Sequence, residues 1–168
     1  MIIQSKKVWV LGNWLEAQVE VEDGKITAIL PYGEKTPDED YGEKRVVPGF
    51  IDIHTHGAYG FDTNDANEEG LRKWMKNIPQ EGVTGTLPTT ITQSEEVLTK
   101  AVANVAKVVD EGYEGAEILG IHFEGPYLDQ KYKGAQPEQY CVKGTIEQFE
   151  RYQKAANGLI KIITMATE

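Results

Sequence analysis

Two patterns of apolar and polar positions divide this chain near residue 47. Before it, short runs alternate apolar and polar residues, which is the period-two pattern of half-buried strands. The segment Glu22-Asp23-Gly24 separates two of these runs, and Asp-Gly in such a place is typical of a β-hairpin. We therefore predict strands at about residues 6–11, 15–22 and 25–30, followed by a charged loop at 33–44.

From residue 46 onward the pattern changes to alternating strands and helices. The predicted strands are RVVPGFIDIHTH, VTGTLPTTI, AEILGIHFEG and LIKIITMATE, and the predicted helices are NEEGLRKWMKNIPQEG, SEEVLTKAVANVAKVVDEG and TIEQFERYQKAANG. Ser94 opens the second helix as a capping residue. Because the strands are almost continuously apolar and alternate with helices, we predict an α/β fold with a parallel sheet covered by helices.

Composition and charge narrow the classes of partner. The chain has 168 residues, with 17 Lys and Arg against 27 Asp and Glu, and its net charge of −10 argues against nucleic acid and anionic membrane surfaces. No apolar run approaches the ~20 residues that span a bilayer, and the N-terminus lacks the order of a signal peptide. A lone cysteine, Cys141, fits a reducing compartment and has no motif of a nucleophile around it. We expect a cytoplasmic protein.

The polar residues with chemical potential fall where the predicted strands end. His54 and His56 share one face of their strand because strand side chains alternate, and Glu124 ends another strand. In parallel sheets of this class, functional residues gather at the carboxyl ends of the strands. Leu87-Pro88-Thr89 and Glu168 fall at such ends too. Two imidazoles and a carboxylate there predict half of a metal site.

Each of these residues also has a plainer interpretation. His-x-His occurs by chance on half-exposed strands, but this strand is apolar, so we expect it to be buried and its histidines to need partners. Glu124 is either a metal ligand or part of a structural salt bridge or helix cap. His122 is expected beneath the site as a hydrogen-bonded packing residue. Asp52 binds either a ligand imidazole, as a supporting residue, or an internal amide.

Three segments together carry a resemblance to a known family. VVPGFIDIHTHG, GVTGTLPTTIT and LGIHFEGPYLDQKYKGAQP, in this order, resemble the N-terminal part of the N-acetylglucosamine-6-phosphate deacetylase family, a branch of the amidohydrolase superfamily of metal-dependent hydrolases. The Pro-Gly-Phe-Ile-Asp-x-His-x-His motif alone indicates only the superfamily. HFEGP followed by KGAQP narrows the resemblance to the deacetylases, and it extends from about residue 8 to the end of the chain.

The resemblance implies a fold, a site and a reaction. It implies a (β/α)8 barrel beside a small β-sandwich. It also implies one or two bound divalent ions, with zinc or iron expected before manganese or cobalt. His54 and His56 match the metal pair of the first barrel strand, Glu124 matches the carboxylate of the third, and Ala135 and Gln136 match a substrate-contacting loop. The metal would activate a water and polarise the acetamide of N-acetylglucosamine 6-phosphate, giving glucosamine 6-phosphate and acetate. Some relatives have a histidine where Gln136 stands.

Length sets the limits of this expectation. A complete barrel needs about 250 residues, so we predict residues 1–47 as part of the sandwich and residues 48–168 as about four βα units. The resemblance places further metal ligands and the acid/base aspartate beyond residue 168, so the chain alone is expected to be inactive, and it implies a homodimer for the complete enzyme. Two alternatives stay open: an amidohydrolase acting on a cyclic amide, and a non-catalytic half-barrel that binds metal or packs with a partner.

Overall fold

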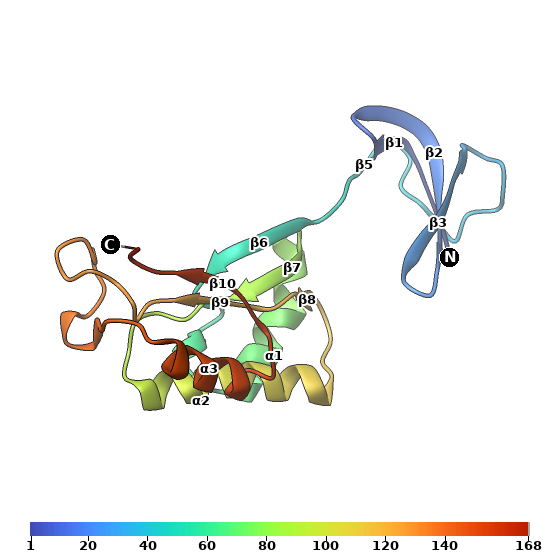
Figure 1. Cartoon of the computed structure of the whole chain (residues 1–168). Helices are drawn as coiled ribbons and strands as arrows, with labels where there is room; N and C mark the ends of the chain where they lie inside the picture. Colours follow the sequence, from blue (N-terminus) through green and yellow to red (C-terminus); the bar gives the residue numbers. More distant parts are fainter. Residues whose placement is uncertain (168) are drawn as a thin grey trace. The chain divides into compact units, whose positions relative to one another are not determined.

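The computed structural model describes residues 1–167 and divides the chain into two compact units, Met1–Pro48 and Gly49–Glu168 (Figure 1). We call them unit 1 and unit 2. The division lies one residue from the predicted domain boundary at 47. Glu168, which we placed at a strand end, lies outside the described residues.

Unit 1 is built from strands. They are β1 (Ile2–Val10), β2 (Asn13–Glu22), β3 (Lys25–Pro31), β4 (Glu39–Asp40) and β5 (Arg45–Val46). β1 pairs with β2 and β2 with β3, both antiparallel, while β4 and β5 lie parallel to β1. The predicted Asp-Gly hairpin is confirmed: Asp23 and Gly24 both have positive φ, 49° and 73°, as a tight turn between twisted strands requires.

Unit 2 alternates strands with helices. Its strands are β6 (Phe50–Thr55), β7 (Val83–Pro88), β8 (Glu117–Ile118), β9 (Ile121–Glu124) and β10 (Ile160–Thr164). Its helices are α1 (Glu68–Asn77), α2 (Glu95–Glu111) and α3 (Ile146–Ala155), with short 3-10 turns η1 (Thr63–Asp65), η2 (Ile78–Glu81) and η3 (Glu138–Tyr140). All of the strand pairs in this unit are parallel among the residues described. The prediction of a mixed α/β fold with parallel strands is confirmed.

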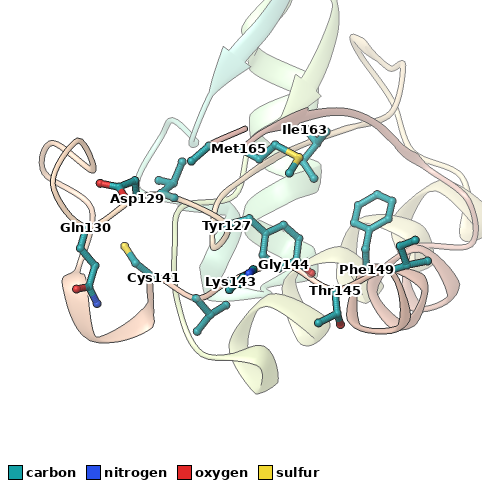
Figure 2. A pocket seen from close by; sticks show the side chains of 14 residues that line it. Tyr127, Asp129, Gln130, Cys141, Lys143, Gly144, Thr145, Phe149, Ile163 and Met165 are labelled. Atoms are coloured by element: carbon teal, nitrogen blue, oxygen red, sulfur yellow. The ribbon is translucent and has the colours of Figure 1, made fainter. Parts of the chain in front are cut away.

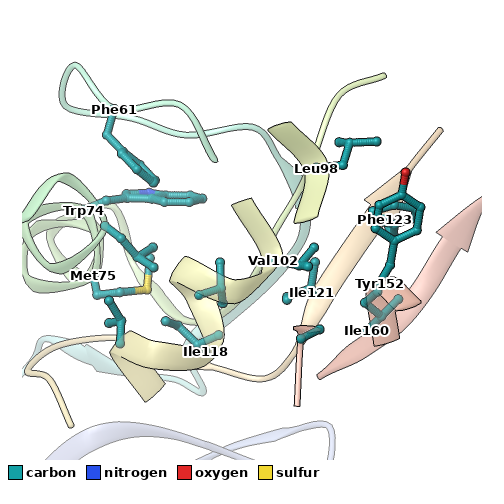
Figure 3. Packing of buried hydrophobic residues seen from close by; sticks show 14 of the residues in the cluster. Phe61, Trp74, Met75, Leu98, Val102, Ile118, Ile121, Phe123, Tyr152 and Ile160 are labelled. Carbon is teal, nitrogen blue, oxygen red and sulfur yellow. The ribbon is translucent and has the colours of Figure 1, made fainter. Parts of the chain in front are cut away.

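The three helices cover one side of the strands of unit 2 (Figure 1). Ser94 caps α2 by accepting a hydrogen bond from Val97 N–H, as predicted. Between helices and strands lies an apolar core that includes Trp74, Phe123 and Tyr152 (Figure 3). This packing fixes the strands, and therefore the positions of the residues at their ends.

In the described part of the chain, no helix is both long and apolar enough to cross a bilayer.

Two predicted strands are each divided in the structure. RVVPGFIDIHTH breaks at Pro48-Gly49, so that β5 pairs with β1 in unit 1 and β6 pairs with β7 in unit 2. AEILGIHFEG breaks before Gly120, whose φ is 153°. Proline lacks the N–H that a strand pairing needs, and a φ in this range strains any residue with a Cβ. The break lets β8 pair with β7 while β9 pairs with β10.

The expectation that the His-x-His strand is buried is wrong. Phe50 and Ile51 of β6 are 70% and 63% exposed, and His54 is exposed as well. Among the described residues β6 has β7 as its one neighbouring strand, so it lies at an edge of its sheet. Apolar sequence alone predicts burial, but burial needs a second neighbour, which β6 lacks here.

Candidate metal centre

Three side chains from two strand ends converge on one point. His54 lies on β6, His56 follows that strand directly, and Glu124 ends β9. Glu124 Oε2 lies 3.5 Å from His54 Nε2 and 3.2 Å from His56 Nε2. One ligand atom from each residue lies within 4.8 Å of the others. The structure therefore brings together the three predicted metal ligands.

The orientation of the His56 ring follows from one hydrogen bond. Its Nδ1 lies 3.2 Å from the carbonyl oxygen of Thr89, which can only accept. Nδ1 is therefore assigned a proton, and Nε2 faces Glu124. This is the tautomer and the second hydrogen bond that a metal-binding histidine uses.

The site fits a cation because its polar atoms lack other partners. Glu124 Oε2 is buried and has no hydrogen bond. A buried carboxylate oxygen without a donor is costly, and a cation facing two imidazole lone pairs would remove that cost. Ligand atoms at about 2.0–2.2 Å from a tetrahedral zinc lie about 3.3–3.5 Å apart. The two Nε2–Oε2 separations, 3.5 and 3.2 Å, match that spacing.

His122 lies beside the three-residue cluster rather than in it. Its Nδ1 donates to the carbonyl oxygen of Ile53 at 2.7 Å, and its Nε2 lies 2.7 Å from Thr164 Oγ1. The ring also stands edge-on to that of His54, with centroids 4.8 Å apart. Both nitrogens are thus occupied, and His122 joins β6, β9 and β10 beside the metal ligands.

Asp52 contacts the backbone of a ligand rather than its imidazole. Its Oδ1 accepts a hydrogen bond from His54 N–H at 3.0 Å, and its Oδ2 accepts one from the hydroxyl of Thr55. Of the two alternatives raised by the sequence, the structure contains the internal amide contact. Asp52 therefore fixes the course of the chain through His54.

The two residues of the predicted substrate loop differ in exposure. Ala135 is exposed, whereas Gln136 is buried and its Oε1 accepts a hydrogen bond from Thr92 N–H at 2.9 Å. The loop from 125 to 144 is thus attached to the segment that follows β7. Only the amide nitrogen of Gln136 remains free to donate to a ligand.

The sequence placed Thr89 at a strand end, but no role was predicted for it or for the threonines that follow it. Thr89, Thr90 and Thr92 are all buried, and each makes a hydrogen bond to another part of the site. The available signal was the unusual run of hydroxyls in LPTTIT at the end of an otherwise apolar strand. Buried hydroxyls need partners; those of Thr89 and Thr90 accept hydrogen bonds from the neighbouring strand ends, whereas Thr92 makes its contact through its backbone N–H.

A cavity of about 800 Å³ lies elsewhere in unit 2, beside α3 and the 125–144 loop (Figure 2). Its lining is mainly apolar, with Val142, Phe149 and Met165 among the contributors, and it includes none of the three candidate ligands. Cys141 borders it, and burial raises the pKa of its thiol, which disfavours the thiolate. The candidate ligands therefore lie at the strand ends and not in this cavity.

Comparison with known proteins agrees with this geometry. Residues 45–168 match the model of the amidohydrolase family. An N-acetylglucosamine-6-phosphate deacetylase from Bacillus subtilis (strain 168) is 40% identical over 160 residues, covering 89% of this chain and 40% of the relative. An N-acetylgalactosamine-6-phosphate deacetylase from Escherichia coli O157:H7 is 28% identical over 168 residues, covering 99% of this chain and 44% of the relative.

A solved structure resembles the whole chain. It is a mutant N-acetyl-D-glucosamine-6-phosphate deacetylase from Mycobacterium smegmatis in complex with N-acetyl-D-glucosamine-6-phosphate, with a TM-score of 0.89 and 25% identity. The similarity covers 100% of this chain and 44% of that one. The present chain thus spans less than half the length of the relatives it matches.

Proposed function

This chain belongs to the amidohydrolase family, and we propose that it is the N-terminal portion of a metal-dependent deacetylase that acts on N-acetylglucosamine 6-phosphate. The observation that carries the proposal is the convergence of His54, His56 and Glu124, with a buried carboxylate oxygen that lacks a partner. The products are glucosamine 6-phosphate and acetate. The substrate is taken from the printed names of the relatives.

In this proposal unit 2 is the first part of a (β/α)8 barrel and unit 1 is part of a small β-sandwich. The order β6, β7, β9, β10 with intervening helices and parallel pairings supports the barrel. The antiparallel sheet β3-β2-β1 supports the sandwich. The complete enzyme is proposed to be a cytoplasmic homodimer, and sedimentation of the full-length protein tests its oligomeric state.

In this proposal the residues of this chain bind the metal and position the substrate, and residues beyond this chain complete the reaction. His54, His56 and Glu124 are the proposed ligands of a divalent cation, which when bound supplies Lewis-acid activation of a water and of the acetamide carbonyl. Asp52 holds the backbone of His54, and His122 supports the same strand through Ile53. Ala135 and Gln136 are proposed to lie against the sugar, with the Gln136 amide nitrogen as the donor. The acid/base aspartate is expected in the remainder of the longer protein.

The decisive experiment measures acetate release from N-acetylglucosamine 6-phosphate. The samples are this chain and a version extended to the length of its relatives, with the added segment taken from the Bacillus subtilis deacetylase. We expect activity in the extended protein and none in the 168-residue chain. If the extended protein is folded and loaded with metal but releases no acetate, the deacetylase proposal is wrong.

A substitution at Glu124 tests the site itself. Glu124→Gln keeps the shape but removes the charge, so we expect activity of the extended protein to fall at least about 100-fold, because even supporting residues of metal sites cost 10–100-fold. Glu117→Gln, at an exposed position of β8, is the matched control and should retain activity. Near-wild-type activity in Glu124→Gln would rule out the ligand assignment.

The galactosamine-type relative supplies a second candidate substrate. N-acetylgalactosamine 6-phosphate differs in the orientation of one hydroxyl, and a deacetylase of that name matches 99% of this chain. Comparing kcat/KM for the two sugar phosphates in the extended protein decides between them. Hydrolysis of a cyclic amide such as a dihydropyrimidine would instead favour the alternative branch of the family.

A further inference from the structure

The segment Thr89–Thr92, which follows β7, contacts both strands that carry the candidate ligands. On the β6 side, the carbonyl of Thr89 accepts from His56 Nδ1, and its Oγ1 accepts from Thr55 N–H at 3.2 Å. Thr89 N–H in turn donates to the carbonyl of Thr55 at 3.1 Å. One threonine thus fixes both the backbone before His56 and the tautomer of its ring.

Thr90 makes corresponding hydrogen bonds to β9, the strand that carries Glu124. Thr90 Oγ1 accepts from Glu124 N–H at 3.2 Å, and Thr90 N–H donates to the carbonyl of His122 at 3.0 Å. Thr90 is fully buried, so water does not replace these bonds. The position of the Glu124 carboxylate therefore depends on a hydroxyl from the segment after β7 rather than from its own strand.

The end of the segment attaches two loops. Ile91 exchanges two hydrogen bonds with the side chain of Asn64, which belongs to the loop after β6. Thr92 N–H donates to Gln136 Oε1 at 2.9 Å, and both residues are buried. The oxygen of Gln136 is thus bonded inside the protein, and it links the 125–144 loop to the segment that holds the ligands.

We propose that Thr89–Thr92 is a positioning segment for the metal centre and that Gln136 is a positioning residue that attaches the 125–144 loop to it. The inference rests on the proposed function only for the existence of the metal site. Three lone-pair donors directed at one point repel each other when no cation is present. Hydrogen bonds from a third strand hold them together in advance, which preserves affinity for the ion.

Cobalt(II) titration of this chain tests the first part, with the visible absorption of the bound ion as the readout. Thr90→Val removes the acceptor for Glu124 N–H while keeping the side-chain shape, and we expect cobalt to bind about fivefold to tenfold more weakly. Thr90→Ser keeps the hydroxyl and should restore affinity to within about twofold of wild type. The matched control is Thr86→Val, because Thr86 on β7 is equally buried but its hydroxyl has no partner.

The outcomes separate positioning from general stability. Weaker binding in Thr90→Val, rescue in Thr90→Ser and wild-type binding in Thr86→Val support the proposal. Equal affinity in Thr90→Val and wild type overturns it, as does an equal loss in Thr86→Val or an absence of cobalt binding by the folded wild-type chain. Cobalt binding without acetate release by the extended protein would refute the proposed function and leave this inference standing.

Amide hydrogen exchange tests the part played by Gln136. Gln136→Met removes the acceptor, so we expect the Thr92 amide to exchange at least about tenfold faster, while cobalt affinity stays within about twofold of wild type. Gln136→Glu keeps an oxygen acceptor and should retain the protection of Thr92. Unchanged protection in Gln136→Met would show that Gln136 does not hold the loop and would overturn its assignment.

Discussion

Units 1 and 2 bury polar groups in opposite ways. In unit 1 the buried Gln18 makes three hydrogen bonds: Nε2 donates to Gln4 Oε1 and to the carbonyl of Lys35, and Oε1 accepts from Lys35 N–H. In unit 2, within the described residues, lie all of the buried side-chain polar atoms that have no partner in the protein, and Glu124 is the charged residue among them. The hydrogen-bonded amide of Gln18 stabilises the fold of unit 1, whereas the Glu124 carboxylate, which has no hydrogen bond at Oε2, indicates a candidate binding site.

The two units also differ in the size of their apolar cores. Unit 1 has a small cluster of three buried residues, Val8, Ala17 and Val19, and relies on its amide network to hold the 33–42 loop. Unit 2 packs a much larger apolar cluster between its helices and strands (Figure 3). A rigid apolar core lets unit 2 keep three mutually repelling ligand atoms together at its strand ends.

The largest expected effect comes from the core of unit 2. Trp74 is completely buried, so Trp74→Ala should lower the free energy of unfolding by about 3–5 kcal/mol, through lost transfer energy and the cavity left behind. Urea unfolding followed by circular dichroism measures it. The control is Trp14→Ala in unit 1, where the side chain is half exposed and a loss below about 1 kcal/mol is expected. Equal losses would contradict the contrast between the units.

Removing the amide of Gln18 tests whether unit 1 depends on its polar network. Gln18→Leu leaves the backbone N–H and C=O of Lys35 without partners, and we expect a loss of about 1–3 kcal/mol together with faster exchange of the Lys35 amide. Gln80→Leu, at an exposed position, is the control. If Gln18→Leu were as stable as wild type, the hydrogen bonds of Gln18 would not contribute to the stability of unit 1.

Tyrosines in unit 2 supply a pH-dependent test. Burial, with a smaller contribution from the Glu95 charge, raises the pKa of Tyr127 to about 12. Because the folded-state pKa lies above the value of about 10 in an unfolded chain, the stabilising contribution is complete below pH 10 and is lost as pH rises from 10 to 12. Burial also raises the pKa of Tyr152.

Tyr127→Phe should therefore reduce the alkaline loss of stability. Its hydroxyl has no partner, so removing it should leave the midpoint of thermal unfolding at pH 7 unchanged or slightly higher. Thermal unfolding of wild type and Tyr127→Phe at pH 8, 10 and 11 gives the comparison. Equal pH dependence in the two proteins would show that folding does not raise the pKa of Tyr127.

The smallest effect is expected at exposed ion pairs, where the two units should not differ. Lys100 pairs with Glu96 in unit 2 and Lys6 with Glu43 in unit 1, all with largely exposed side chains. Lys100→Ala and Lys6→Ala should each leave the midpoint of urea unfolding almost unchanged, because such pairs are screened by solvent. Unfolding at low and high salt measures this, and a clear fall of the midpoint in either variant would show that the pair is structurally important.

Local pattern predicted most of the elements. The Asp23-Gly24 turn, the Ser94 cap and the alternation of strands with helices all depend on residues close in sequence, and the structure contains each of them. The two divided strands were missed because apolar character continues across Gly49 and Gly120, while pairing partners change there. Pairing is a long-range property that apolar pattern does not report.

The sequence alone determined which residues are candidates for metal binding: strand periodicity placed His54 and His56 on one face, and Glu124 was expected at the same edge because it ends another strand. Only the tertiary structure decided that β6 is exposed and that both nitrogens of His122 are occupied. It also decided that Thr90 accepts from Glu124 N–H and that Gln136 joins the 125–144 loop to Thr92. The reason is physical. Residue type and spacing are local, whereas burial and hydrogen-bond satisfaction depend on neighbours tens of residues away in the chain.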